Sequence, residues 1–137
     1  MMQYENNFYR TSDGLLDVEF LFVDLGGTNG WRAYILTDIN YQMFSSSRST
    51  ACSTIHRLTE GNDDMKRKII NFMQMTRQMN NVDRTIYYIC WSNPIHNLSD
   101  MREVAKTWSE ITAYYIRNGG SFGSIQPKLK RRGVISL

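Results

Sequence analysis

The chain has 137 residues, 42% of them hydrophobic, and a formal net charge of +3. This size and apolar content suit one domain with a real core, and the length is short for two domains. Apolar runs fall far below the ~20 residues that a membrane span needs. The start MMQYENNFYR lacks the basic-then-apolar pattern of a signal peptide. We therefore expect no membrane partner and a cytoplasmic location.

Two cysteines, Cys52 and Cys90, occur in a chain without a visible export signal, which favours free thiols over a disulfide. Cys90 falls inside an apolar segment, so we expect it to be a small buried core residue. The cysteines and the two histidines have unrelated spacings that do not form a zinc motif. We expect no metal and no cofactor.

Charge is distributed unevenly along the chain. Residues 1–60 hold four Lys/Arg and seven Asp/Glu, whereas residues 61–137 hold twelve and six. The basic second half favours an anionic partner, which is a nucleic acid, a nucleotide or an acidic protein. Solvated helix faces produce the same bias, so charge alone does not choose between these alternatives.

The first half of the chain predicts strands. Residues 3–10 suit a strand, and residues 11–14 suit a turn because Asp and Gly favour it. Residues 15–24 alternate in polarity, and after a glycine-rich corner residues 31–39 form a third strand, which indicates an antiparallel hairpin. Residues 41–54 are polar and suit a loop or an exposed edge strand.

The second half predicts two helices around one strand. Methionines and other apolar residues recur at helical spacing over residues 63–79. Residues 85–91, TIYYICW, suit a buried strand that ends before Pro94. A helix then runs over residues 99–118, and Asn118-Gly119-Gly120 ends it. The residues predicted to form the buried face of this helix are Met101, Val104, Ala105, Trp108, Ile111, Thr112 and Tyr115.

Strands grouped early and helices grouped late predict an α+β fold, a mostly antiparallel sheet of N-terminal strands with two main helices packed on it. We expect both helices to cover one face. Residues 1–122 form a single domain in this interpretation. Residues 123–137 form a basic C-terminal tail with few apolar residues at its start, and we expect it to be mobile.

One glycine-rich motif looks like a phosphate loop. The segment Asp24-Leu25-Gly26-Gly27-Thr28-Asn29 resembles the first phosphate loop of the sugar-kinase and actin-like ATPase families. Those enzymes need two lobes and further phosphate and adenosine loops, for which this chain is too short. A plain hairpin turn explains the glycines without a ligand.

The candidate binding residues combine aromatic, basic and amide groups. Aromatic rings stack on bases, and arginines bind phosphates. Trp91 and Phe122 are the aromatic residues that we expect to be most exposed, and Asn93 and Asn97 lie near Trp91 along the chain. The remaining candidates are Arg117, at the end of the second helix, with His56 and Arg57.

No catalytic set can be assembled from these residues. No serine, cysteine or carboxylate has a spacing that ties it to His56 or His96. The second helix separates Trp91 from Phe122 by ~27 Å if each lies at one of its ends. A shared site then requires a second subunit, which agrees with a homo-oligomer expected from the methionine-rich helix and the abundant aromatic residues.

A wider pattern runs through the second half of the chain. It reads YICW, NPI, M-x-x-x-A-x-x-W-x-x-x-T-x-x-YI and G-x-x-F shifted by one extra glycine, and GWRAYILTDINY and STIHRL lie upstream. Over about residues 30–122 this order resembles the small phage Thoeris anti-defence proteins of the first described type. The resemblance implies an N-terminal antiparallel sheet followed by helices, and dimers or higher oligomers in the host-cell cytoplasm.

The resemblance also implies a function. Such proteins capture a cyclic ADP-ribose isomer made by a bacterial TIR-domain enzyme without degrading it, and some take up cyclic oligonucleotides at separate sites. The expected function is thus sequestration of a nucleotide signal rather than catalysis. The alternative, from the basic tail and helix, is a small phage protein that binds nucleic acid or inhibits a host protein. An enzyme acting on nucleotides is the third alternative.

Overall fold

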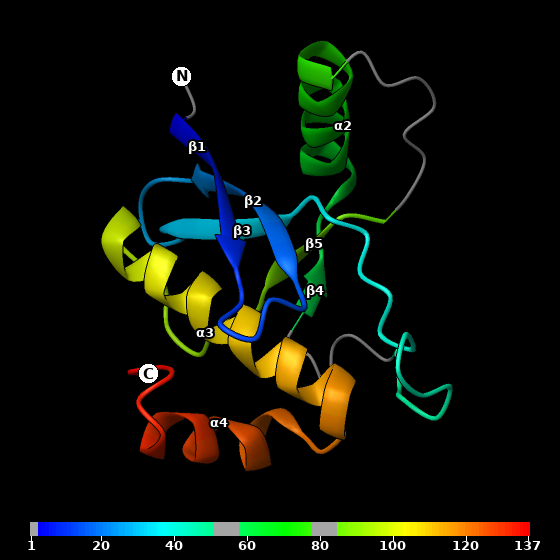
Figure 1. The fold of residues 1–137 in the computed structure, drawn as a ribbon. Helices are drawn as coiled ribbons and strands as arrows, with labels where there is room; N and C mark the ends of the chain where they lie inside the picture. The colour runs from blue at the N-terminus through cyan, green and yellow to red at the C-terminus, as the bar shows by residue number, and fades with distance from the viewer. Residues whose placement is uncertain (1–2, 51–57, 78–84) are drawn as a thin grey trace.

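The computed structural model describes residues 3–50, 58–77 and 85–137 (Figure 1). Its centre is a five-stranded sheet in the order β1-β2-β3-β5-β4, and every neighbouring pair is antiparallel. The strands are β1 (Gln3–Arg10), β2 (Asp17–Asp24), β3 (Trp31–Ile35), β4 (Leu58–Glu60) and β5 (Tyr87–Ile89). The helices are α2 (Asp63–Arg77), α3 (Leu98–Asn118) and α4 (Phe122–Arg131). The predicted α+β fold is confirmed.

Two cores lie on opposite faces of this sheet, because β2 carries apolar side chains on both of its faces. Phe20 and Phe22 point into the larger core with α3 and α4, and Leu21 and Val23 point into a smaller core with α2. Figure 1 shows α2 on one side of the sheet and α3 with α4 on the other. Our expectation that both main helices cover one face was therefore wrong. The mixed second face of β2 is apolar enough to take a helix of its own.

Helix α3 follows its sequence signals closely. Asn97 is the N-cap, and its side chain accepts a hydrogen bond of 2.8 Å from the Asp100 N–H. At the other end Gly119 has a φ of +78°, and its N–H donates to the Tyr115 carbonyl. All seven residues of the predicted face are buried. The face and the ends of this helix are confirmed within a residue or two.

A residue that the sequence did not single out secures the end of α3. The Arg48 guanidinium donates to the carbonyl oxygens of Ile116 (3.2 Å) and Arg117 (3.0 Å). These carbonyls lack partners within the helix, so a cation that binds them stabilises its C-terminus. The bonds also fasten the irregular segment after β3 to α3.

The residues that we expected to form a mobile tail instead contain helix α4. Ser121 caps it, and Phe122, Ile125 and Leu129 recur at helical spacing and are buried against the larger core. Ile135, beyond the helix, is buried in the same core. The segment is poor in apolar residues, but these few lie on one stripe, which is sufficient to dock a short amphipathic helix.

The fifth strand is shorter than the predicted 85–91, and Cys90 is exposed rather than buried. Pairing with β3 and β4 ends at Ile89. After it the chain leaves the sheet, so Cys90 loses the cover that a continuing strand would give. Cys52 lies outside the described residues. None of the described helices is long and apolar enough to cross a membrane.

Candidate ligand-binding cleft

The loop between β2 and β3 is a closed hairpin turn. Gly26 and Gly27 have φ values of +73° and +57°, a conformation that side chains with a Cβ rarely adopt. The Gly26 N–H donates to the Asp24 carboxylate (2.9 Å), and the Leu25 N–H donates to the Gly30 carbonyl (2.9 Å). These contacts show that the glycines belong to a hairpin turn, and the turn explains why they are present.

The same hairpin supports the segment after β5. The Trp31 N–H donates to the Ile95 carbonyl (2.7 Å), and Gly30 lies directly against that carbonyl. A Cβ at Gly30 would overlap the carbonyl oxygen. This close approach holds residues 91–95 beside β3 and creates a hollow between them.

That hollow is rich in aromatic residues, and we call it the aromatic hollow. Its volume is about 250 Å³. Three aromatic side chains line it, together with the exposed Cys90 and the amide of Asn93. The aromatic residues are Trp31, Tyr88 and Trp91.

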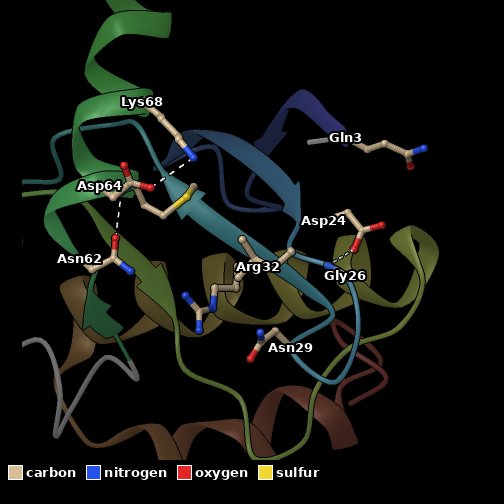
Figure 2. A pocket seen from close by; sticks show the side chains of 10 residues that line it. Gln3, Asp24, Gly26, Asn29, Arg32, Asn62, Asp64 and Lys68 are labelled. Carbon is tan, nitrogen blue, oxygen red and sulfur yellow. Dashed lines mark hydrogen bonds and ion pairs between the residues drawn. The ribbon is translucent and has the colours of Figure 1, made fainter. Parts of the chain in front are cut away.

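A second hollow, the charged hollow, opens between the β2–β3 loop and the first turns of α2 (Figure 2). Its volume is about 640 Å³. Two cations, Arg32 and Lys68, and two carboxylates, Asp24 and Asp64, line it with several amides. Lys68 pairs with Asp64 at 3.2 Å, but both side chains are more than half exposed, so this pair contributes only about 0–1 kcal/mol. A ligand can therefore compete for Lys68.

Arg32 and Asn29 line both hollows. The two hollows therefore adjoin at these residues, and we call the adjoining pair the cleft. The Arg32 guanidinium lies 4.4 Å from the centre of the Tyr88 ring, where a cation–π contact holds it. Within residues 3–50, 58–77 and 85–137 it has no carboxylate partner. A half-buried guanidinium that lacks a neutralising carboxylate is well suited to an anionic ligand.

Tyr34 lies beneath this arginine and is fully buried. Burial raises the pKa of the Tyr34 hydroxyl, and the positive charge of Arg32 partly opposes the rise. The hydroxyl has no well-formed hydrogen bond within the described residues. Tyr34 therefore stays neutral at ordinary pH and leaves the charge of Arg32 uncompensated.

Two of the predicted site residues, Trp91 and Asn93, line the aromatic hollow. Phe122, which we expected to be exposed, is instead buried, because it is the first residue of α4 and packs edge-on against Trp91 with ring centres 6.5 Å apart. It therefore supports the wall of the hollow from behind. The ~27 Å separation expected between these two rings was wrong. Asn97 caps the start of α3, whereas Trp91 reaches Phe122, so residues 91–97 run back along α3. An extended segment of seven residues can span up to ~23 Å.

The other predicted residues lie elsewhere. Asn97 uses its side chain as the cap of α3. Arg117 pairs with Asp13 at 2.7 Å and lies over the Phe44 ring, outside the linings of both hollows. His56 and Arg57 lie outside the described residues.

Sequence reasoning did not select Arg32 and Lys68, which line the charged hollow, as candidate site residues. Arg32 had a usable signal, because it is a charged residue within an otherwise apolar strand. Lys68 had none, since it is one of several cations on α2. The described residues contain no group of three or more potential metal ligands. The chain matches no protein-family model, no curated protein and no solved structure.

Proposed function

We propose that this protein binds a small nucleotide in the cleft formed by the charged and aromatic hollows, and holds it without cleaving it. The observation that carries the proposal is the unneutralised guanidinium of Arg32 at the junction of the two hollows. A nucleotide joins an anionic phosphate to a flat base, and the cleft joins a cationic wall to an aromatic one.

In this proposal the phosphates bind Arg32 and Lys68, and the base enters the aromatic hollow against Trp91 or Tyr88. The Asn93 amide is available to bond a base edge. Carboxylates accept hydrogen bonds from ribose hydroxyls, which gives Asp24 and Asp64 a role beside the two cations. Pockets for small ligands commonly have volumes of ~300–1,000 Å³, a range that the two hollows together reach.

The finer identity of the ligand rests on the sequence resemblance. We propose a cyclic ADP-ribose isomer, captured as an immune signal by a phage anti-defence protein. Such a ligand carries an adenine and a pyrophosphate. The chemical character of these two groups matches that of the aromatic and the cationic parts of the cleft. Capture rather than turnover is likewise part of what the resemblance implies.

Calorimetry with purified cyclic ADP-ribose isomers tests the proposal, followed by heating of the complex and mass spectrometry of the released ligand. We expect binding and recovery of intact ligand. Altered ligand would make the protein an enzyme. No binding of any isomer, or of adenine nucleotides, would refute nucleotide capture.

A matched pair of arginine variants locates the site. Arg32→Gln removes a charge-assisted hydrogen bond worth about 1.5–3 kcal/mol, so affinity should fall about 10- to 150-fold while the protein stays folded. Arg131→Gln makes the same chemical change at an exposed position of α4 and should bind like wild type. Equal affinity of the two variants would remove Arg32 from the site.

One observation favours the second candidate function, binding of nucleic acid. Helix α4 and the residue after it expose Lys128, Lys130, Arg131 and Arg132, and no described carboxylate pairs with them. Such a stripe suits a polyanionic backbone. Salt-sensitive binding of a labelled oligonucleotide that is lost in Arg131→Gln, with Arg32→Gln unaffected, would favour this alternative.

A further inference from the structure

A groove lies between the sheet and α2, beside the charged hollow, and we call it the apolar groove. Its volume is about 340 Å³, which is within the range of small-ligand pockets. It shares Lys68 and Met65 with the charged hollow, so the two adjoin at the first turns of α2. The nucleotide proposed above does not enter this groove, which is available to a second ligand.

The inner part of the apolar groove is built from β2 and α2. Leu21 and Val23, two positions apart on β2, both line it and are buried. Beside them the rings of Tyr4 and Phe72 meet edge-on, with centres 5.6 Å apart. Tyr4 is nevertheless 56% exposed. The groove is therefore apolar at its base and open to solvent along its rim.

The end of the groove near Met75 is the most open part. Met75 lines the groove and is 84% exposed. Figure 1 shows the C-terminal end of α2 extending beyond the strands, so no strand covers this end of the helix. Exposed apolar surface beside a groove is typical of a binding site. The flexible thioether of Met75 can adapt its shape to an apolar ligand.

Charge lies at the opposite end of the groove. Lys68 is the one charged side chain among the described residues that line it. Lys68 and Met75 are seven positions apart on α2, so they lie on the same side of the helix, ~10 Å apart along its axis. The pair between Lys68 and Asp64 is largely exposed and leaves the ammonium available to a ligand. The groove is thus cationic at one end and apolar along its length.

We propose that the apolar groove binds a free fatty acid of medium chain length. The carboxylate binds the Lys68 ammonium, and the hydrocarbon chain lies along Val23 and Phe72 toward Met75. Charge complementarity identifies the head group, because Lys68 supplies the only charge of the described lining. The groove also suits the tail, because a hydrocarbon chain gives up no hydrogen bonds to water when it enters an apolar site. The ~10 Å between Lys68 and Met75 matches the length of an extended octanoate.

Calorimetry with hexanoate, octanoate and decanoate, each below its micelle concentration, tests the tail. We expect affinity to rise about fourfold for each added CH₂, because a buried CH₂ contributes about 0.8 kcal/mol. Octylammonium has the octyl tail with the opposite charge and should bind about 4- to 25-fold more weakly than octanoate. Affinity that does not depend on chain length, or that is equal for the two head groups, would overturn the proposal.

A matched pair of lysine variants tests the head group. Lys68→Gln should lower octanoate affinity about two- to fivefold, the range expected for a charge pair at a half-exposed position. Lys66→Gln makes the same change two positions earlier on α2, outside the lining of the groove, and should bind octanoate like wild type. Equal affinity of the two variants would remove Lys68 from the site.

Nuclear magnetic resonance of protein labelled with ¹³C at its methionine methyl groups locates the ligand. Octanoate should shift the methyl signals of Met65 and Met75, which line the groove, and leave that of Met101 in the larger core unchanged. A shift at Met101 with none at Met75 would overturn the assigned site. Octanoate has neither a base nor a phosphate, so its binding or failure to bind is independent of nucleotide capture.

Discussion

Trp108 shows how much of the larger core depends on one side chain. It is fully buried in the middle of α3, and its ring meets Phe20 of the sheet edge-on, with ring centres 6.3 Å apart. Trp108→Ala should lower the free energy of unfolding by about 3–5 kcal/mol, because the sheet and α3 cannot collapse fully into the cavity. Urea unfolding measures this loss. A loss near zero would mean that this face of α3 is not packed against the sheet.

At the same scale, Asp13 and Arg117 form a surface pair between the first turn and the end of α3. Partial burial acts to raise the pKa of Asp13, but hydrogen bonds from Leu15, Thr11 and Arg117 outweigh it, so the pKa is lowered below 3.8. A lowered folded-state pKa adds stability above the unfolded pKa, and this stability is lost as the pH falls through the folded value.

We therefore expect Asp13→Asn to remove a small contribution, about 0–1 kcal/mol for an exposed pair, at pH 6. The difference between the variant and wild type should shrink as the pH falls below 3.8 and through the lowered pKa of Asp13. Thermal melts from pH 2.5 to pH 7 measure it. A difference that grows as the pH falls would contradict the lowered pKa.

Among the connecting elements, the β2–β3 hairpin depends on Gly30. Both Gly30 (φ +67°) and Gly27 (φ +57°) have left-handed backbones, but only Gly30 lies against the Ile95 carbonyl. Gly27→Ala should cost about 1–2 kcal/mol from backbone strain alone. Gly30→Ala should cost more, because it also separates the hairpin from residues 91–95. Equal losses in chemical denaturation would contradict this close approach.

Helix α4 provides the corresponding test at the other side of the molecule. Leu129 is 5% exposed, whereas its neighbour Lys130 is exposed. Leu129→Ala should lower the free energy of unfolding by about 2–5 kcal/mol, and Lys130→Ala should change it by less than about 0.5 kcal/mol. Similar stabilities of the two variants would indicate a loosely attached tail, as the sequence first suggested.

Across the whole molecule, the two faces of the sheet are supported unequally. The larger core unites α3, α4 and the sheet, whereas among the described residues α2 gives the smaller core three buried side chains, Met65, Ile69 and Met73, with Phe72 partly buried beside them. Local opening is easier where fewer apolar contacts are lost. Amides of α2 should therefore exchange with deuterium at least roughly tenfold faster than those in the middle of α3. Equal protection of both helices would contradict this.

The sequence by itself determined the features that depend on local periodicity and capping. The strands near residues 3–10 and 17–24, the apolar stripe of α3 and the glycine end of α3 are all readable within a few residues. The α+β class follows from the order of these elements. Trp91 and Asn93 could be chosen because an aromatic residue and an amide flank a proline corner.

Only the tertiary structure decided what depends on contacts between distant segments. Strand pairing and helix docking bring Arg32, Lys68 and Trp91 around one cleft, although 59 positions separate Arg32 from Trp91 in the printed sequence. The docking of α4, the exposure of Cys90 and the use of both sheet faces have the same origin. Local patterns report which side of an element is apolar, but burial depends on which other element covers that side, and this is a property of the assembled chain.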